Sequence, residues 1–133
     1  MKITRRTDYA IHLIADLSDN PDKPLGLRTL AERHGVTYAF ARTVQQGLLK
    51  AGIVSTARGI NGGIKLARPL KDITLLEVFE AAQDPLDKAF STKGSTWCNC
   101  EDSCVSDNVW VSTRDVLDKH FSSIQLNHII KSK

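Results

Sequence analysis

Three cysteines lie close together in the second half of the chain, and the sequence contains no others. They are Cys98, Cys100 and Cys104, in a polar stretch of a 133-residue chain. Thiolates bind zinc and iron–sulfur clusters, and cysteines of low pKa act as redox-active thiols. In a reducing cytoplasm, clustered cysteines indicate such a site before they indicate disulfides, and an odd number argues against a disulfide framework.

The spacing of these thiols leaves the kind of site open. Zinc fingers pair two knuckles with about two to four residues between ligands, whereas Cys-x-Cys-x3-Cys has no fourth cysteine or histidine nearby. Histidine can replace cysteine on one iron of a cluster, although a single histidine is more often a structural or surface residue. From the spacing alone, an iron–sulfur site and a zinc site are about equally favoured, and redox-active thiols are less favoured than either. The further ligand candidates in the chain are Asp8, His12, His34, His120 and His128.

Positive charge is concentrated before the cysteines. Residues 1–72 contain 12 Lys and Arg against 6 Asp and Glu, a net +6, whereas residues 73–133 contain 6 against 9, a net −3, which together give the chain's +3. This asymmetry indicates that only the first half binds a polyanion such as nucleic acid. A chance distribution of solvated charge is the simpler alternative for this feature taken alone.

Chain length and hydropathy limit the class of protein. A chain of 133 residues is expected to form one domain with at most an appendage, and it can bury a core without disulfides. No run of about 18 apolar residues is present, so no membrane-spanning segment is expected. The first residues, MKITRR, have no long apolar stretch behind them. A signal peptide is therefore not expected, and the cytoplasm is the expected compartment.

The first predicted helix covers residues 7–18. Its apolar residues have the i, i+3, i+4, i+7 spacing of one buried helical face. They are Ala10, Leu13, Ile14 and Leu17. Asp8 and His12 lie one turn apart on a different face. The sequence NPDKP at residues 20–24 then ends the helix as a turn.

Two further predicted helices are joined by a short turn. Residues 27–34 form the first of them, and Gly35 ends it in a left-handed conformation. Thr37 is a good N-cap for the next helix, over residues 38–50, which Gly52 closes. The residues expected to point inward are Leu27, Leu30, Ala31, Ala41, Val44, Leu48 and Ala51. Two helices joined by the sequence GVT make a helix-turn-helix pattern.

A β-hairpin is predicted directly after the third helix. Residues 53–58 are strand-like, and GINGG at residues 59–63 forms a turn that tolerates positive φ. Residues 64–67 return with alternating apolar and polar side chains, and Pro69 ends the strand. A hairpin in this position is the wing of a winged helix. The sequence therefore predicts a mainly α fold with a small β-hairpin.

The polar face of the third helix predicts contacts with DNA. In a helix-turn-helix the second helix of the motif enters the major groove with its N-terminal end first. Arg42 and Gln46 lie opposite the buried face, and arginine reads guanine while glutamine reads adenine. Arg58 on the wing is expected beside the backbone or in the minor groove. Expected phosphate contacts come from Thr37, Tyr38, Thr43, Lys2, Arg5, Arg6 and Arg28. Any one of these alone is more simply a solvated side chain, so the ordered pattern carries the prediction.

The second half of the chain is expected to hold a cofactor and a dimer contact. Thr74 caps a short helix to residue 82, with Glu77 three residues on. Residues 84–106 show no periodicity and contain the three cysteines, and a loop of that length is usually functional or disordered. We therefore divide the chain into a winged helix-turn-helix DNA-binding region, residues 1–72, and a cofactor-binding loop with a dimerisation helix, residues 73–133.

A longer helix is predicted over residues 106–124. Its apolar stripe and the two flanking valines are Trp110, Leu117, Phe121, Ile124, Val109 and Val116. A lone helix cannot bury both flanks of such a stripe on a small domain. Dimer formation through this helix is preferred, and packing against its own winged helix is the alternative.

Several stretches resemble the bacterial Rrf-type winged-helix transcriptional regulators. They are TDYA at residues 7–10, LAERHGV at 30–36, LKAGIV at 49–54, RGINGGI at 58–64 and ITLLEV at 73–78. The pattern of Cys104 followed by Trp110 is also similar. The resemblance covers nearly the whole chain, and the wing motif is specific.

This resemblance implies a homodimer that binds a pseudo-palindromic operator in double-stranded DNA. The third helix would enter the major groove with Tyr38, Arg42 and Gln46, and the wing would bring Arg58 to the minor groove. The long C-terminal helix would cross to the partner subunit, after a loop that holds an iron–sulfur cluster. The implied signal is redox state, iron–sulfur status or nitric oxide, and the sign of regulation stays open.

The cysteine loop departs from the common family pattern of three regularly spaced cysteines. Cys98 and Cys104 keep that spacing, but Thr92 stands at the first position and Cys100 is additional. Other members use a carboxylate from the partner subunit at position 8, and a redox-sensing branch uses a histidine at position 34. The resemblance implies a ligand set drawn from Cys98, Cys100, Cys104, Asp8 and His34. A 2Fe–2S cluster is preferred, and a 4Fe–4S cluster on Asp8 and the three cysteines is the alternative. In the simplest alternative Asp8 caps the first helix and His34 merely precedes the turn.

Three other functions are considered. A zinc- or thiol-based winged-helix regulator would keep the DNA-binding surface and change the sensor. A protein-interaction module without DNA binding conflicts with the polar face of the third helix and the charge of the first half. An enzyme would need a nucleophile paired with a base in a pocket, and nothing in the sequence places one, so no enzymatic activity is expected.

Overall fold

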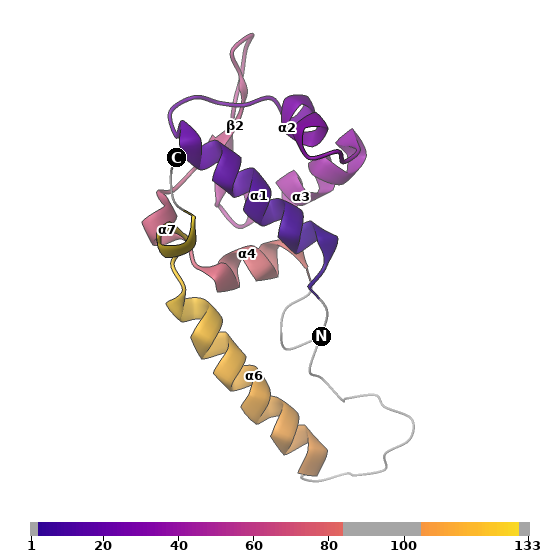
Figure 1. Ribbon diagram of the computed structural model, residues 1–133, viewed down its shortest axis with the longest axis vertical. Helices are drawn as coiled ribbons and strands as arrows, with labels where there is room; N and C mark the ends of the chain where they lie inside the picture. Colours follow the sequence, from indigo (N-terminus) through magenta and orange to yellow (C-terminus); the bar gives the residue numbers. More distant parts are fainter. Residues whose placement is uncertain (1–2, 84–104, 131–133) are drawn as a thin grey trace.

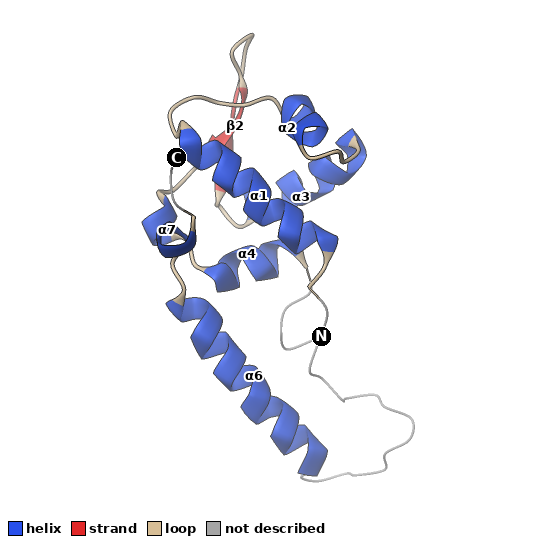
Figure 2. Ribbon diagram, viewed as in Figure 1, coloured by secondary structure: helices blue, strands red, loops and turns tan. Residues whose placement is uncertain are grey.

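The computed structural model describes residues 3–83 and 105–130. All three cysteines and residues 84–104 of the loop predicted around them lie outside these residues, whereas residues 105–106 of that predicted loop already belong to a helix. The described elements are α1 (Arg5–Asp19), α2 (Leu27–Arg33), α3 (Tyr38–Lys50), β1 (Val54–Ala57), β2 (Gly63–Leu66), a 3-10 turn (Leu70–Asp72), α4 (Leu75–Ala82), α6 (Val105–Ser123) and α7 (Leu126–Ile129) (Figure 1). This mainly helical structure with one two-stranded antiparallel sheet is the predicted fold class (Figure 2).

Helix α1 crosses the middle of the core. It begins two residues before the predicted start because Thr4 is its N-cap and accepts a hydrogen bond from the Thr7 N–H at 3.4 Å. The side chain of Asp8 does not cap this helix. The four apolar residues predicted to face inward are all buried, at 0 or 1% exposure. Their burial contributes about 1.5–3 kcal/mol per large aliphatic side chain.

The turn between α2 and α3 is fixed by local backbone chemistry. Gly35 has φ 64°, which is the left-handed conformation that glycine adopts without steric cost. The Val36 N–H donates to the Ala31 carbonyl at 3.0 Å, and the Thr37 hydroxyl accepts from the Phe40 N–H at 3.2 Å. These caps end α2 and begin α3 where the sequence predicted. Ala51 is a correction: it is exposed rather than buried, because α3 ends at Lys50 and Ala51 is its C-cap.

The wing is a short hairpin with an anchored base. Strands β1 and β2 pair antiparallel, with Val54 opposite Leu66 and Ala57 opposite Gly63. Leu25 and Ile64 exchange two backbone hydrogen bonds of 2.9 Å, so the segment before α2 forms a bridge along the other edge of β2. A Cβ atom at Gly63 would lie 2.3 Å from the Leu25 carbonyl oxygen. Glycine is therefore needed for this close approach.

The chain after the wing returns to the same core. Thr74 and Glu77 form the predicted capping box at the start of α4. Val78 and Phe79 are at most 1% exposed, and Leu126 of α7 is also buried. Leu126 donates a backbone hydrogen bond of 3.0 Å to Ile73, so α7 is held beside the start of α4. Both regions of the predicted division thus contribute side chains to one core.

Helix α6 runs away from this core toward the end of the molecule opposite the wing (Figure 1). None of its residues is buried. Its contact with the core lies near its C-terminal end, where the rings of Phe121 and Phe79 are 5.5 Å apart. Val105, Val109 and Val116 expose 79, 53 and 65% of their surface. Packing of α6 along its own winged helix is therefore limited to its last turns. Within the described residues, no helix has the length and hydropathy needed to cross a membrane.

Candidate functional site

The predicted DNA-reading residues of α3 share one exposed face. Arg42 and Gln46 are exposed, and so are Thr37 and Tyr38 at the helix start. The opposite face is buried through Ala41, Val44 and Leu48. The helix therefore presents a polar surface on a rigid support, which begins in its first turn, where Ala41 is buried and Phe40 packs against the core.

Arg28 of α2 and Tyr38 of α3 form a stacked pair beside this surface. The guanidinium carbon of Arg28 lies 4.8 Å from the centre of the Tyr38 ring. At this distance the ring attracts the cation, which restrains both side chains. Arg28 is exposed, so its charge is held close to the N-terminal end of α3. The two predicted phosphate contacts from different helices are thus brought together.

Arg58 directly follows β1 on the wing, and Figure 1 shows the wing at the same end of the molecule as α2. It is exposed and directly precedes Gly59, whose φ of 101° is a conformation that other residues rarely adopt. The wing and the two helices of the motif thus offer three separate basic or polar groups. Their role in nucleic-acid binding stays a prediction.

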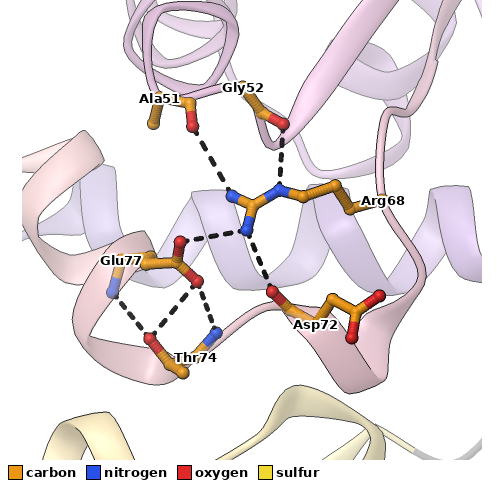
Figure 3. A network of polar contacts seen from close by, with 6 residues as sticks. All are labelled: Ala51, Gly52, Arg68, Asp72, Thr74 and Glu77. Carbon is orange, nitrogen blue, oxygen red and sulfur yellow. Dashed lines mark hydrogen bonds and ion pairs between the residues drawn. The ribbon is translucent and has the colours of Figure 1, made fainter.

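Arg68 ties the C-terminal end of α3 to α4 (Figure 3). Its guanidinium group donates to the carbonyl oxygen of Gly52 at 3.2 Å and to that of Ala51 at 3.5 Å. It also donates to the Asp72 carbonyl at 2.9 Å and to the Glu77 carboxylate at 3.0 Å. A planar fork with several donors suits such a junction. Sequence reasoning missed this residue because its partners come from three different segments.

Glu77 completes the junction. Partial burial by itself raises the pKa of this carboxyl, but hydrogen bonds from the Thr74 backbone and from Arg68, with the charge of Arg68, outweigh it. The pKa of Glu77 is therefore lowered below its ordinary value. The group stays ionised and keeps accepting from Thr74 and Arg68.

Asp8, His12 and His34 gather on one side of α1. The Asp8 carboxylate lies 3.8 Å from the His12 Nε2 atom, and their side chains are 72 and 56% exposed. The His12 and His34 rings are 5.2 Å apart. The three residues line a small hollow of about 170 Å³ together with Arg5, Tyr9, Val36 and Phe40. Asp8 and His12 are accessible donors of the types that iron accepts.

His34 differs from its two neighbours because a carboxylate already engages it. Its Nε2 atom lies 2.5 Å from the Asp16 carboxylate, which also pairs with Arg33 at 3.4 Å. A metal bond from His34 would therefore come from Nδ1 or would replace the contact with Asp16. Sequence reasoning missed Asp16, because nothing in the sequence signals a contact across 18 positions.

Tyr9 lies behind His34 in the core. Its ring meets the His34 ring edge-on at 5.9 Å and lies 5.7 Å from Phe40 of α3. Burial, with the negative charge of Asp16, raises the pKa of the Tyr9 hydroxyl. The hydroxyl therefore stays neutral, and Tyr9 forms an uncharged part of the lining of the hollow beside Phe40 of α3.

The described residues of one subunit supply only part of the ligands that an iron–sulfur cluster needs. Among residues 3–83 and 105–130, no three His, Cys, Asp or Glu side chains are grouped closely enough to hold a metal ion. Asp8 and His12 supply two accessible donors, and further ligands would come from the thiols outside these residues. His12 was among the histidines that the sequence offered, but only its i, i+4 spacing from Asp8 indicated that it would join this cluster.

Gln83 and Val105, the described residues that flank the cysteine-containing segment, lie in different parts of the molecule. Gln83 is held beside the first turn of α1, where its side chain accepts from the Thr4 N–H at 3.2 Å and from the Thr7 hydroxyl. Val105 begins α6, and with a rise of about 1.5 Å per residue it lies about 24 Å along that helix from Phe121. Val105 is thus far from the point where Phe121 of α6 meets Phe79 of the core.

A family model and two known proteins match nearly the whole length of this chain. A family model described as Rrf2, iron-dependent transcriptional regulator, matches residues 3–132. Protein aau3 of Rhizobium meliloti is 30% identical over 100% of this chain and 87% of its own length. The HTH-type transcriptional regulator IscR of Photorhabdus laumondii is 27% identical over 100% of this chain and 81% of its own length.

A solved structure shares the fold. T. potens IscR has a TM-score of 0.74 and 26% identity, covering 98% of this chain and 87% of its own. The winged-helix fold predicted from the sequence is confirmed by this similarity. The relatives named as regulators are not enzymes, in agreement with the expectation from the sequence. On the match of its family model, the chain belongs to the Rrf2 family of transcriptional regulators.

Proposed function

We propose that this Rrf2 regulator acts as a homodimer whose DNA binding is controlled by an iron–sulfur cluster. The observation that carries the proposal is the position of Asp8, His12 and His34. These potential ligands lie on α1 and at the C-cap of α2, and His34 is followed by the turn that leads into α3. A change in what these residues bind is therefore transmitted directly to the DNA-reading helix.

The DNA-binding region consists of residues 1–72 in this proposal. Arg42 and Gln46 read base edges in the major groove, and Tyr38 assists at the start of α3. Thr37 and Arg28 contact phosphates, and Arg58 reaches the backbone or the minor groove from the wing. Two copies bind a pseudo-palindromic operator in double-stranded DNA, with half-sites about one helical turn apart.

Residues 73–133 supply the cofactor loop and the dimer contact in this proposal. The exposed valines of α6 support the contact, because an apolar helix side of this kind gains stability only against another surface. Trp110, Leu117 and Phe121 lie on the neighbouring stripe, and Trp110 remains 42% exposed. A second copy of α6 is the occupant that a symmetric dimer would supply.

The proposed ligands are drawn from Cys98, Cys100, Cys104, Asp8 and His34. A cluster held by thiolates together with a carboxylate or an imidazole would change charge and stability with redox state, which suits a sensor. A 2Fe–2S cluster on Asp8, His34 and two cysteines is preferred. The rival is a 4Fe–4S cluster on Asp8 and the three cysteines, and His12 competes with His34 for the imidazole position.

The ligands are proposed to come from both subunits. The long separation between the start of α6 and its contact with α4 supports this arrangement, because α6 carries the end of the cysteine segment away from its own α1. If α6 crosses to the partner, the thiols of one subunit approach Asp8 of the other. Cluster occupancy would then link the dimer contact to the DNA-reading helices.

The direct test is anaerobic purification of the full-length chain, followed by iron and sulfide assay and visible absorption spectroscopy. We expect iron and acid-labile sulfide in equal amounts, and loss of the absorption bands in Cys104→Ala. Stoichiometric zinc without sulfide would support the zinc-based regulator and overturn the cluster. Metal-free protein with reversible oxidation of the cysteines would support the thiol-based regulator.

Single substitutions on α1 and α2 separate the ligand models. His34→Ala removes the cluster under the 2Fe–2S model and leaves the spectrum nearly intact under the 4Fe–4S model. Asp8→Ala is damaging under both. His12→Ala tests the competing imidazole, and His128→Ala of α7 is a matched control for the loss of an exposed histidine. An Asp8→Ala protein with an unchanged spectrum would exclude Asp8 as a ligand.

A further inference from the structure

The tip of the wing exposes a large apolar side chain. Ile60 has a relative exposure of 105%, which is the highest of the exposed large hydrophobic residues in the described part of the chain. Most of the others lie on α6, where a dimer contact is proposed. Ile60 instead lies in the loop that joins β1 to β2, and Figure 1 shows this hairpin at the end of the molecule opposite α6.

The turn that carries Ile60 is held in one shape. The Gly62 N–H donates to the Gly59 carbonyl at 3.0 Å, so Ile60 and Asn61 occupy the two corner positions of a tight turn. Gly59 has φ 101°. A Cβ atom at Gly62 would lie 2.3 Å from the Ala57 carbonyl oxygen. These glycines fix the tip, so Ile60 is presented with little conformational freedom left to lose on binding.

The surroundings of the tip favour a polyanion. Arg58 is exposed two positions before Ile60. Lys23 and Pro24 line a shallow hollow with Ile60, Asn61 and Gly62, and Asp22 is the one acidic residue among its lining. An apolar tip with an exposed arginine two positions before it and a lysine in the same hollow suits a narrow groove lined by phosphates. Its place on the wing, at the same end as α2 and Arg58, continues the predicted nucleic-acid surface.

We propose that Ile60 is a specificity determinant that enters the DNA minor groove and selects A·T base pairs beside each half-site. The minor groove is about 6 Å wide, which admits a turn but not a helix. In G·C pairs the guanine amino group projects into this groove, where it would meet the apolar side chain. A·T pairs lack this group and offer acceptors to the Asn61 amide. Minor-groove proteins are known to insert apolar side chains into this groove, although they place them between base steps.

This inference rests on the DNA-binding part of the proposed function and is independent of the cluster. The test uses the full-length protein and duplexes selected by it from a random pool. In these duplexes the flanking pairs are then changed to A·T, G·C or inosine·C. Inosine·C resembles G·C in the major groove but lacks the minor-groove amino group. We expect binding to A·T and inosine·C flanks to be similar, and about fivefold tighter than to G·C flanks, the lower end of the range for one base pair.

Ile60→Ser should reduce this fivefold ratio to near one while leaving the affinity for G·C flanks unchanged. Ile129→Ser of α7, which removes another exposed isoleucine, should keep the ratio. Inosine·C that behaves like G·C would overturn the minor-groove reading, and so would an Ile60→Ser protein that keeps the preference. Equal weakening on all flanks would overturn the specificity role and leave a general contact. Wild-type protein that selects no sequence at all would instead contradict the DNA-binding proposal itself.

Discussion

The end of the molecule that carries α2, α3 and the wing is supported differently from the end that carries α6. At the first end, the exposed polar face of α3 has a buried face behind it, the Thr37 cap at its start and the Arg68 junction at its C-terminal end. At the other end, α6 has 19 residues and none of them is buried. The polar face of α3 is supported within one chain, whereas the exposed apolar side of α6 is proposed to pack against a second chain.

This difference separates the two halves of the proposed mechanism. Recognition of DNA depends on side chains that a single subunit already positions. In the proposed mechanism, assembly and sensing depend on a second copy, because α6 extends away from the core. Substitutions at the end with α2, α3 and the wing should therefore impair DNA recognition, whereas substitutions in α6 should impair assembly and sensing.

The largest effect is expected from Leu117→Asp on α6. A charge on the apolar stripe opposes burial that is worth about 1.5–3 kcal/mol for each large side chain, and it does so twice in a symmetric dimer. Sedimentation should show monomers with an unchanged circular dichroism spectrum. Lys119→Asp places the same residue on the other side of the helix and should leave the dimer intact. A dimeric Leu117→Asp protein would remove α6 as the interface.

Arg42→Ala should affect specificity and not assembly. Loss of the guanidinium should cost about 1–3 kcal/mol at one position per half-site and relax the preference there. Arg58→Ala should weaken binding more evenly across sequences. For about 6–10 phosphate contacts in the dimer, affinity should also fall about 10³-fold or more between about 50 and 200 mM salt. An unchanged sequence preference for Arg42→Ala in a binding-site selection would place the reading face elsewhere.

Arg68→Ala should weaken the support of the DNA-reading helix. The loss of hydrogen bonds from a charged donor to the end of α3 and to Glu77 should lower the free energy of unfolding by about 1–3 kcal/mol. Arg68→Lys keeps the charge but lacks the fork, so it should recover only part of the loss. Denaturant unfolding measures both variants. Equal stability of Arg68→Ala and the parent would show that the junction is not stabilising.

The smallest effect concerns Glu77 and pH. Its pKa is lowered in the folded state from an ordinary value of 4.5. The stabilisation is therefore fully present above that value and is lost as the pH falls through the folded-state pKa. Glu77→Gln should flatten this acidic part of the stability curve without changing its shape near neutral pH. A parallel curve for the variant and the parent would contradict the coupling to Arg68.

Local signals explain why much of the fold could be predicted from the sequence. Thr37, Thr74 and Gly35 act on neighbouring backbone groups, so short motifs were sufficient to locate them. The prediction that Ala51 is buried was wrong, because helix periodicity does not show where the last turn ends. The pair of His34 with Asp16 and the four partners of Arg68 depend on how separate segments pack, and no spacing in the sequence reveals them.

The candidate site was predictable to a lesser extent. The exposed face of α3 followed from the positions of its buried residues, whereas the approach of His12 to His34 required the packing of α2 on α1. The roles of Cys98, Cys100 and Cys104 remain predictions, since they lie outside the described residues. Their proposed pairing with Asp8 of a second subunit has no signal within one sequence.

Mixed dimers test most directly whether a cluster is shared between subunits. One subunit carries Asp8→Ala and the other Cys104→Ala, and differently tagged copies are co-expressed and purified anaerobically as the heterodimer. If the thiols of one subunit join Asp8 of the other, one site is intact and the other lacks both ligands. The heterodimer should then contain about half the iron and sulfide of the parent dimer, while each variant homodimer contains none. A heterodimer without iron and sulfide would show that Asp8 and Cys104 act within the same subunit and would contradict the shared site.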